Sequence, residues 1–432
     1  MYKVLPRAPS DGFVDTESTS PTYALALLTA VYAFNQLDRQ ILALMLESIK
    51  ADFEVSDTVL GLISGIGFAA IYVVSSLVFS RWADRGPRIA IVSGGLAVFS
   101  VITACTGFVQ NFYQLAITRI GIAIGEGTSI APSTSVISDY FPIASRGRAM
   151  SIFSGGGFLA TITLFPVLGW IAEHWGWREA FVVAGLPGLI LSLLLWRTVR
   201  DPVRGSADGT PDAGTEPVAE TLRFLVKQRT VLLACASACF SSWPLYCFAI
   251  WTPTFLSRVH DMNHVEIAFI SGVIGSTAGL CGALAGGAFA DWLGRFDVKW
   301  RLTGPALLTL LNIPAGCIFL FAESDAVMLP AFALLSFITI SPIGATWAGL
   351  QSAAKPRMRA LTSSIYLTFW MMAGLGIGTL VVGMLNDYLN PTLGVSTIRY
   401  SLLAPLVAQL IGSPLLALAG LCLGKDMARV NN

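Results

Sequence analysis

Long apolar segments follow one another along almost the whole of this 432-residue chain, and they constrain its fold more than any other feature. A helix needs about 20 apolar residues to cross the roughly 30 Å hydrocarbon core of a bilayer. Twelve segments meet that requirement. Charged residues make up only 12% of the chain, about half the fraction found in soluble domains. The sequence therefore predicts an all-α polytopic membrane protein with twelve transmembrane helices.

The twelve segments form two groups of six, separated by a polar stretch over residues 200–220. Their apolar cores begin at Tyr23, Val59, Ile89, Phe112, Ala149 and Phe181, and then at Val231, Val265, Leu302, Val327, Ser363 and Tyr400. We predict five parts: a tail over 1–20, a six-helix bundle over 21–199, a flexible linker over 200–229, a second six-helix bundle over 230–424 and a tail over 425–432.

Lys and Arg are distributed unevenly between the predicted loops. If both ends of the chain lie on one side, 21 of the 27 Lys and Arg lie on that side and only four on the other. Cationic loops stay in the cytoplasm, so this asymmetry predicts that both termini and the linker are cytoplasmic. The cations are scattered and the net charge is only +1, which argues against a nucleic-acid partner.

Two short stretches place ionisable groups inside the predicted spans: NQLDRQ, residues 35–40, and RIGIAIGEG, residues 119–127. An ionisable side chain near the middle of a span costs roughly 2.5 to 3.5 kcal/mol and normally has a function. Arg119 and Glu126 are seven residues apart, on one helix face but about 10.5 Å apart along the axis, so they cannot easily pair with each other. We therefore predict pairs between helices: Arg119 with Asp38, and Glu126 with Arg39 or with water in a cavity.

Such a neutral cluster can couple protons to a charged solute. Protonation of one carboxylate leaves an arginine without its partner, and the arginine fork binds phosphate or carboxylate oxygens bidentately. We predict Asp38 and Glu126 as proton-coupling residues, and Asn35, Arg39 and Arg119 as substrate-binding residues. The alternative is a static ion network that only orients the helices.

The second half differs from the first in the corresponding segments. Residues 231–256 and 363–385 contain no charged side chain and are rich in aromatic ones. Charges on one wall of a cavity and aromatic rings on the other suit an amphiphile with a polar head and an apolar tail. The predicted contacts from this half are Trp243, Tyr246, Trp251, Tyr366 and Trp370, although packing between helices is the alternative role of each ring.

A short motif recurs in the two halves. SRWADRGPR follows the second segment and GAFADWLGR follows the eighth, so Asp84 and Asp291 lie 207 residues apart in matching contexts. This repeat indicates two parallel halves, and transporters commonly bind substrate between such repeats.

These features resemble the major facilitator superfamily, over about residues 21–424. The signature G-x-x-x-D-R-x-G-R-[RK] of that family aligns on residues 80–89, where Asp84, Arg85 and Arg88 match. A finer resemblance is to the Spinster family of lysolipid and sphingolipid transporters. It rests on N-x-x-D-R in the first segment, on the arginine seven residues before the glutamate in the fourth, and on GEGTSIAPSTSVISDYF. The anion:cation symporter family shares the first-helix D-R and the fourth-helix G-E and is the nearest competitor.

The resemblance implies an alternating-access secondary transporter of the bacterial plasma membrane, acting as a monomer among membrane lipids. Its substrate would be an amphiphilic anion or zwitterion, such as a lysophospholipid or a sphingolipid, moved with protons. Charged residues at helix ends would form a cytoplasmic gate; they are Asp84, Arg85, Arg88, Asp139, Arg148, Asp291 and Arg295.

Other functions are compatible with the same sequence. Proton-coupled symport of small organic or sugar acids, multidrug or amphiphile export, and a transport-inactive receptor or lipid scramblase are the alternatives. The three histidines lie near predicted extracellular helix ends without a nucleophile or metal-ligand constellation, so we expect no enzyme, no metal and no cofactor beyond a proton gradient.

Overall fold

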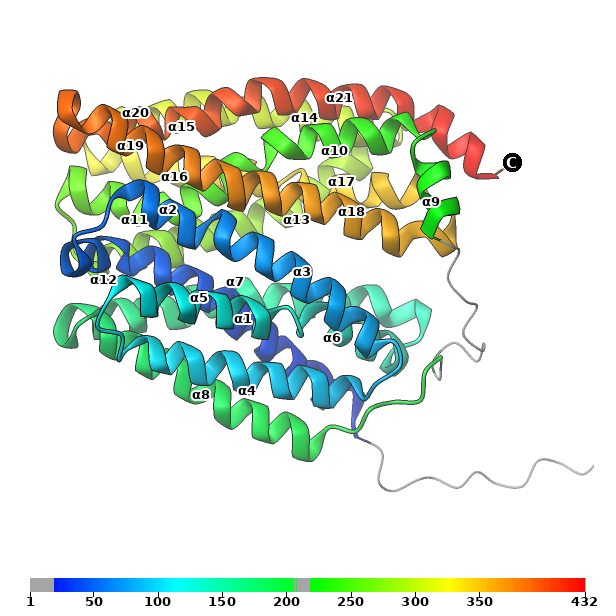
Figure 1. Cartoon of the computed structure of the whole chain (residues 1–432). Helices are drawn as coiled ribbons and strands as arrows, with labels where there is room; N and C mark the ends of the chain where they lie inside the picture. The colour runs from blue at the N-terminus through cyan, green and yellow to red at the C-terminus, as the bar shows by residue number, and fades with distance from the viewer. Residues whose placement is uncertain (1–18, 206, 208–217, 432) are drawn as a thin grey trace, which may run out of the picture.

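The structure is a computed structural model that describes residues 19–205, 207 and 218–431, and within these residues it contains helices and no strand (Figure 1). Two bundles of long helices lie beside each other with their axes roughly parallel, one from each half of the chain. The start of α1 (Pro21–Phe53), the end of α21 (Leu403–Asn431) and the linker lie together at what we call the terminal end. The opposite end, which carries the turn after α1, is the distal end.

The first half contains seven further helices, namely α2 (Asp57–Ser64), α3 (Ile66–Ala83), α4 (Arg88–Thr106), α5 (Phe112–Glu126), α6 (Ile130–Tyr140), α7 (Ile143–Trp175) and α8 (Trp177–Thr198). One short helix, α9 (Val218–Leu225), precedes the second half.

The second half continues with α10 (Arg229–Ser241), α11 (Trp243–His260), α12 (His264–Ala268), α13 (Ser276–Gly294), α14 (Trp300–Leu308), α15 (Asn312–Phe321), α16 (Asp325–Ile340), α17 (Ile343–Ser352), α18 (Arg359–Met371), α19 (Thr379–Leu393) and α20 (Thr397–Ser401). Two π-helical stretches, Phe269–Gly275 and Met372–Gly378, join α12 to α13 and α18 to α19.

The helices correspond to the twelve predicted segments. Among the described residues, nine helical stretches are long and apolar enough to cross a membrane, and the last, Pro356–Val430, covers both the eleventh and the twelfth segment. The two remaining segments, α1 and α5 with α6, are those interrupted by charged residues. The fold is therefore that of a multi-pass membrane protein.

The second segment is broken at Gly65 because the two halves approach closely there. A Cβ atom at Gly65 would lie 2.8 Å from the carbonyl oxygen of Leu375, in the π-helical stretch of the other half. One turn earlier, a Cβ at Gly61 would lie 2.9 Å from the carbonyl oxygen of Thr379. Glycine therefore allows α2 and α3 to pack directly on the backbone of the eleventh segment.

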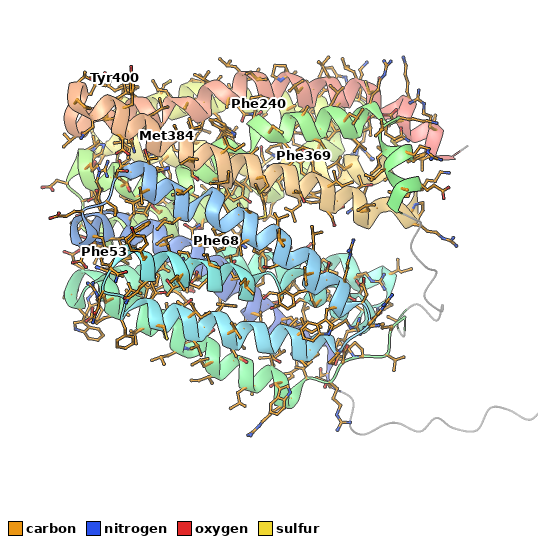
Figure 2. The ribbon with its side chains drawn as sticks, in the orientation of Figure 1. Phe53, Phe68, Phe240, Phe369, Met384 and Tyr400 are labelled. Carbon is orange, nitrogen blue, oxygen red and sulfur yellow. The ribbon has the colours of Figure 1, made fainter. Side chains whose placement is uncertain are left out.

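Apolar side chains cover the outside of the bundles as well as filling them. Phe369, Met384 and Tyr400 stand on the second half and are about half exposed (Figure 2). Phe68 is buried on α3, near the middle of the molecule, where the two halves face each other. Because the outer surface of a membrane protein contacts lipid chains, such exposure is expected there.

The polar segments at the terminal end are only partly described. The N-terminal tail predicted over 1–20 lies outside the described residues except for Thr19 and Ser20, and so do residue 206 and residues 208–217 of the predicted linker. The linker predicted as flexible from Arg200 onward does not begin as a free segment, because Arg200–Gly205 is hydrogen-bonded to the first bundle.

Candidate functional site

Arg39 and Glu126 form an ion pair between α1 and α5 inside the first bundle. Arg39 Nε donates a hydrogen bond of 2.8 Å to Glu126 Oε2, and Arg39 Nη2 lies 2.7 Å from the same oxygen. The Glu126 side chain is fully buried, whereas that of Arg39 is 18% exposed. A buried carboxylate beside a partly accessible arginine is the arrangement in which the arginine can reach a solute.

A second ion pair lies deeper in the same bundle. Arg119 Nη1 lies 3.4 Å from Asp38 Oδ2, and both side chains are buried. Thr103 on α4 donates a hydrogen bond of 2.6 Å from its hydroxyl to Asp38 Oδ1. These are the two cross-helix pairs that the spacing predicts, whereas the contribution of Thr103 was not predicted. No pattern in the sequence distinguishes Thr103 from the other hydroxyl groups of the apolar segments.

The hydrogen-bonding capacity of this cluster is not fully used by the described residues. Glu126 Oε1 and Asn35 Oδ1 are buried acceptors without a partner, and Arg119 Nε and Nη2 are buried donors without one. The Asn35 amide nitrogen does bond, to Ser129 Oγ at 3.3 Å. Buried polar atoms are nearly always paired, so unused ones point to a water, a proton or a ligand.

Aromatic rings flank both arginines. The Arg39 guanidinium lies 4.7 Å from the ring centre of Tyr72 and 5.5 Å from that of Phe68, both on α3. The Arg119 guanidinium lies 5.5 Å from the ring of Phe181. Tyr72 and Phe68 were not among the predicted site residues, although their i,i+4 spacing on an apolar helix is a visible signal. Such rings stabilise a cation inside an apolar environment.

The predicted aromatic residues of the second half divide into two groups. Tyr246 packs edge to face against Trp370, with ring centres 5.2 Å apart. Trp243 is partly exposed, but its indole nitrogen is buried and has no partner. These three residues remain candidates for contact with a solute.

Trp251 and Tyr366 are placed differently. Trp251 is fully buried and donates a hydrogen bond of 3.1 Å to the carbonyl oxygen of Thr379 within its own half. Tyr366 is buried and packs edge to face against Trp347. Both side chains fill the packing between helices in this structure, and their contact with a substrate stays a prediction.

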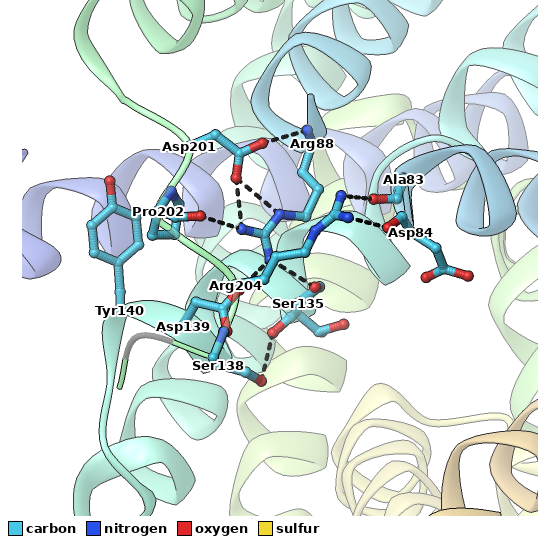
Figure 3. A network of polar contacts seen from close by, with 12 residues as sticks. Ala83, Asp84, Arg88, Ser135, Ser138, Asp139, Tyr140, Asp201, Pro202 and Arg204 are labelled. Carbon is cyan, nitrogen blue, oxygen red and sulfur yellow. Dashed lines mark hydrogen bonds and ion pairs between the residues drawn. The ribbon is translucent and has the colours of Figure 1, made fainter. Parts of the chain in front are cut away.

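At the terminal end, Arg88 is the centre of a polar network (Figure 3). It bonds to Asp139, to Asp201 Oδ1 at 2.9 Å and to the carbonyl oxygen of Pro202 at 2.7 Å. Arg204 donates to backbone carbonyl groups at the end of α3, including that of Ala83 at 2.7 Å. The network therefore fastens the first residues of the linker to the first bundle; Asp201 and Arg204 were not predicted.

The other predicted gate residues do not join the two bundles. The side chains of Asp84, Arg85, Arg148, Asp291 and Arg295 are exposed, and within the part of the chain that the structure describes they form no ion pair. Among the described residues, the hydrogen bonds and ion pairs between the two halves are all at the distal end.

The distal contacts are centred on Arg258 of α11. Its guanidinium donates to Glu47 Oε2 at 2.6 Å and to Asp57 Oδ2 at 2.6 Å, with a second bond to each carboxylate at 2.8 Å. Lys50 Nζ lies 2.5 Å from Asp57, and Asp387 accepts from the backbone nitrogen of Thr58 at 2.7 Å. This distal network was not predicted, because charges at predicted helix ends are usually solvated.

The chain is similar in sequence and in structure to known membrane transporters. A family model described as the Major Facilitator Superfamily matches residues 28–379. An "MFS-type efflux pump" of Mycolicibacterium smegmatis is 32% identical, over 90% of this chain and 90% of its own length. A "Probable L-galactonate transporter" of Escherichia coli is 27% identical over 68% of each chain. A solved bacterial homolog of the human lysosomal transporter Spinster, in an inward-facing and unoccupied conformation, superposes with a TM-score of 0.84 at 26% identity, covering 94% of this chain and 98% of that one.

Proposed function

This chain belongs to the major facilitator superfamily, and on that basis we propose that it moves an amphiphilic organic anion across the membrane together with protons. Membership of the family makes it a secondary transporter and not an enzyme. The observation that carries the finer proposal is the Arg39–Glu126 pair, in which a buried carboxylate in the first bundle holds a partly exposed arginine.

The coupling follows from the charges of the cluster. Asp38, Arg39, Arg119 and Glu126 sum to zero when all are ionised. Protonation of Glu126 would leave the positive charge of Arg39 without its partner. Because the Arg39 side chain is 18% exposed, an anionic solute could then bind to it. Glu126 has an oxygen without a partner and is the preferred proton acceptor, whereas Asp38 is held by Thr103 and Arg119.

The remaining residues would bind the two ends of the solute. Arg39, with Asn35 and Arg119 behind it, would hold a phosphate or carboxylate group. Trp243, Tyr246 and Trp370 would contact the apolar part, because aromatic rings offer a large apolar area with polar edges. A lysophospholipid has both groups.

The proposed orientation places the terminal end in the cytoplasm, as the excess of Lys and Arg on that side favours. Since the halves are bonded to each other only at the distal end among the described residues, the structure would correspond to an inward-facing conformation. The similarity to an inward-facing Spinster homolog supports this assignment.

A second candidate is transport of a small organic acid without an apolar tail. It is favoured by the similarity to the probable L-galactonate transporter, because galactonate is a carboxylate that the same arginine fork could bind. Export of amphiphiles, as the similarity to an efflux pump suggests, differs from the main proposal only in substrate range and direction.

Transport by the purified protein in proteoliposomes tests the proposal. We would measure uptake of a labelled lysophospholipid and of labelled galactonate, with and without an imposed pH gradient, for the wild type and for Glu126→Gln, Asp38→Asn and Arg39→Gln. Glu323→Gln, an exposed carboxylate in the turn before α16, is the matched control.

The expected result is lysolipid transport that depends on the gradient, that Glu126→Gln uncouples from pH, that Arg39→Gln abolishes and that Glu323→Gln leaves unchanged. Transport of galactonate without transport of the lysophospholipid would mean that the substrate is a small acid and not an amphiphile. Gradient-independent transport that is equal in all variants would refute the coupling role of the cluster.

A further inference from the structure

The short helix α9 lies across the terminal end of the second bundle, with its axis nearly perpendicular to the long helices (Figure 1). The helix of the seventh predicted segment begins at Arg229, four residues after α9 ends. With the long helices crossing the bilayer, a helix at this position would lie at the level of the lipid head groups, parallel to the membrane surface.

The two sides of α9 have different partners. Thr221 and Leu225, four residues apart, are buried and face the second bundle, where Leu225 joins a core with Val231 and Leu423. Leu222 and Val226 form the next row and are 44% and 65% exposed. The helical turn continues past Leu225, since the Val226 nitrogen donates to the Leu222 carbonyl oxygen at 3.0 Å.

A basic row lies beside this exposed apolar row. Arg223 and Lys227 are exposed and line a shallow groove, open to solvent, together with Ala219, Phe224 and the carboxylate-bearing Glu220. The ammonium group of Lys355, in the turn between the tenth and eleventh segments, lies 5.3 Å from the ring centre of Phe224. Two adjacent rows, one cationic and one apolar, are typical of a surface that binds anionic lipid.

We propose that α9 and the groove beside it bind an anionic phospholipid of the adjacent leaflet. The phosphodiester lies between Arg223 and Lys227, and the acyl chains run along Leu222 and Val226. Lys355 adds positive charge and contacts the Phe224 ring. A lipid bound here would therefore contact both α9 and the turn before the eleventh segment. The site is separate from the Arg39–Glu126 cluster, and the inference does not depend on the transported substrate.

The choice of a lipid over a soluble anion rests on the apolar row. A free phosphate would use the two cations but would gain nothing from two exposed aliphatic side chains, which are costly to leave in water. Glu220 lowers the attraction for any anion in the groove, so an occupant that also buries apolar area is favoured.

The test is lipid binding by the full-length protein in detergent, followed by native mass spectrometry. The probes are phosphatidylglycerol, phosphatidylcholine and glycerol phosphate, each titrated separately. The variant Arg223→Gln/Lys227→Gln removes the basic row. The matched control, Arg81→Gln/Arg197→Gln, removes two exposed arginines from the terminal end of the first half and has the same net charge.

We expect wild-type protein to bind phosphatidylglycerol more tightly than phosphatidylcholine. A near-surface cation contributes a factor of about five to affinity, so the double variant should weaken the first phosphatidylglycerol site about tenfold or more, after allowance for screening. Glu220→Gln should tighten it, and Leu222→Ser/Val226→Ser should weaken it without a change of charge. Arg39→Gln should leave it unchanged.

Four results would overturn the proposal: equal weakening by the control pair, equal affinity for phosphatidylcholine, competition by glycerol phosphate at the same concentration as the lipid, or loss of the site in Arg39→Gln. The first would indicate nonspecific charge attraction, and the last would place the lipid in the transport site. The substituted side chains are exposed except for that of Arg39, and thermal unfolding of each variant checks that it is folded.

Discussion

Removal of Arg258 should open the distal end of the molecule. In Arg258→Gln, Glu47 and Asp57 lose the bidentate bonds that join α1 and α2 to α11. Asp57 is only 2% exposed and would stay buried with Lys50 alone, whereas separation of the halves would hydrate it. The substitution therefore destabilises the distal-closed conformation more than the distal-open one.

The size of the effect follows from the burial of the three side chains. Breaking a buried pair costs about 3 to 5 kcal/mol, but an exposed pair contributes less than about 1 kcal/mol. Glu47 is 27% exposed and Asp57 keeps Lys50, so we take about 2 to 3 kcal/mol for the difference between the conformations. This shifts the ratio of the two populations about 30- to 150-fold, so a minor distal-open state of about 1% would rise to between about a quarter and 60%.

Electron–electron double resonance can measure this shift. Spin labels on Ala51→Cys and Asn390→Cys report the distance between the halves, because both residues are exposed at the distal end on opposite bundles; the seven native cysteines are replaced first. Arg178→Gln is the matched control, since Arg178 pairs with Asp52 within the first half. A distance distribution in Arg258→Gln identical to the wild type, or equal broadening in Arg178→Gln, would show that the Arg258 contacts do not hold the distal end closed.

Three further substitutions test other contacts. Gly61→Val should also favour the distal-open state in the spin-label assay, because the added Cβ would lie 2.9 Å from the Thr379 carbonyl oxygen; an unchanged distance would contradict the close approach. Arg88→Gln should lower the free energy of unfolding by about 3 kcal/mol or more, measured by thermal melting, because it leaves two carboxylates without their arginine, whereas exposed Arg85→Gln should have little effect. Thr103→Val should slow transport roughly tenfold by removing the Asp38 hydrogen bond, and Thr103→Ser should restore it; equal rates in proteoliposomes would remove Thr103 from the site.

The sequence predicts the two ion pairs of the first half because helical periodicity fixes which side chains share a face. The seven-residue spacing of Arg119 and Glu126 excludes a pair within α5, so each must find a partner on another helix, and Asp38 and Arg39 are the only other charges among the apolar segments of that half. The structure has both pairs. Because an ionised side chain inside a membrane span carries a free-energy cost, such residues are rare there and are easily recognised in a sequence.

Contacts at the helix ends could not be predicted in the same way. Arg258 pairs with residues 201 and 211 positions earlier, and Asp387 accepts from backbone groups 329 and 330 positions earlier. A charge in a polar turn costs little when solvated, so its sequence context gives no reason to expect a partner. Asp201 and Arg204 were missed for the same reason, since they stand in a stretch whose composition favours a linker.

Among the described residues, the hydrogen bonds and ion pairs between the two halves lie at the distal end, so the two ends contribute unequally to the free energies of the distal-closed and distal-open conformations. A transporter needs both conformations within a few kcal/mol of each other, yet the distal network stabilises only the distal-closed one. We therefore propose that opening of the distal end is compensated by contacts formed at the terminal end. Asp84 and Arg85 in the first half, and Asp291 and Arg295 in the second, are exposed there and form no ion pair among the described residues. We propose that these four residues pair across the halves only when the distal end is open, because groups that paired in both conformations could not offset the loss of the Arg258 contacts.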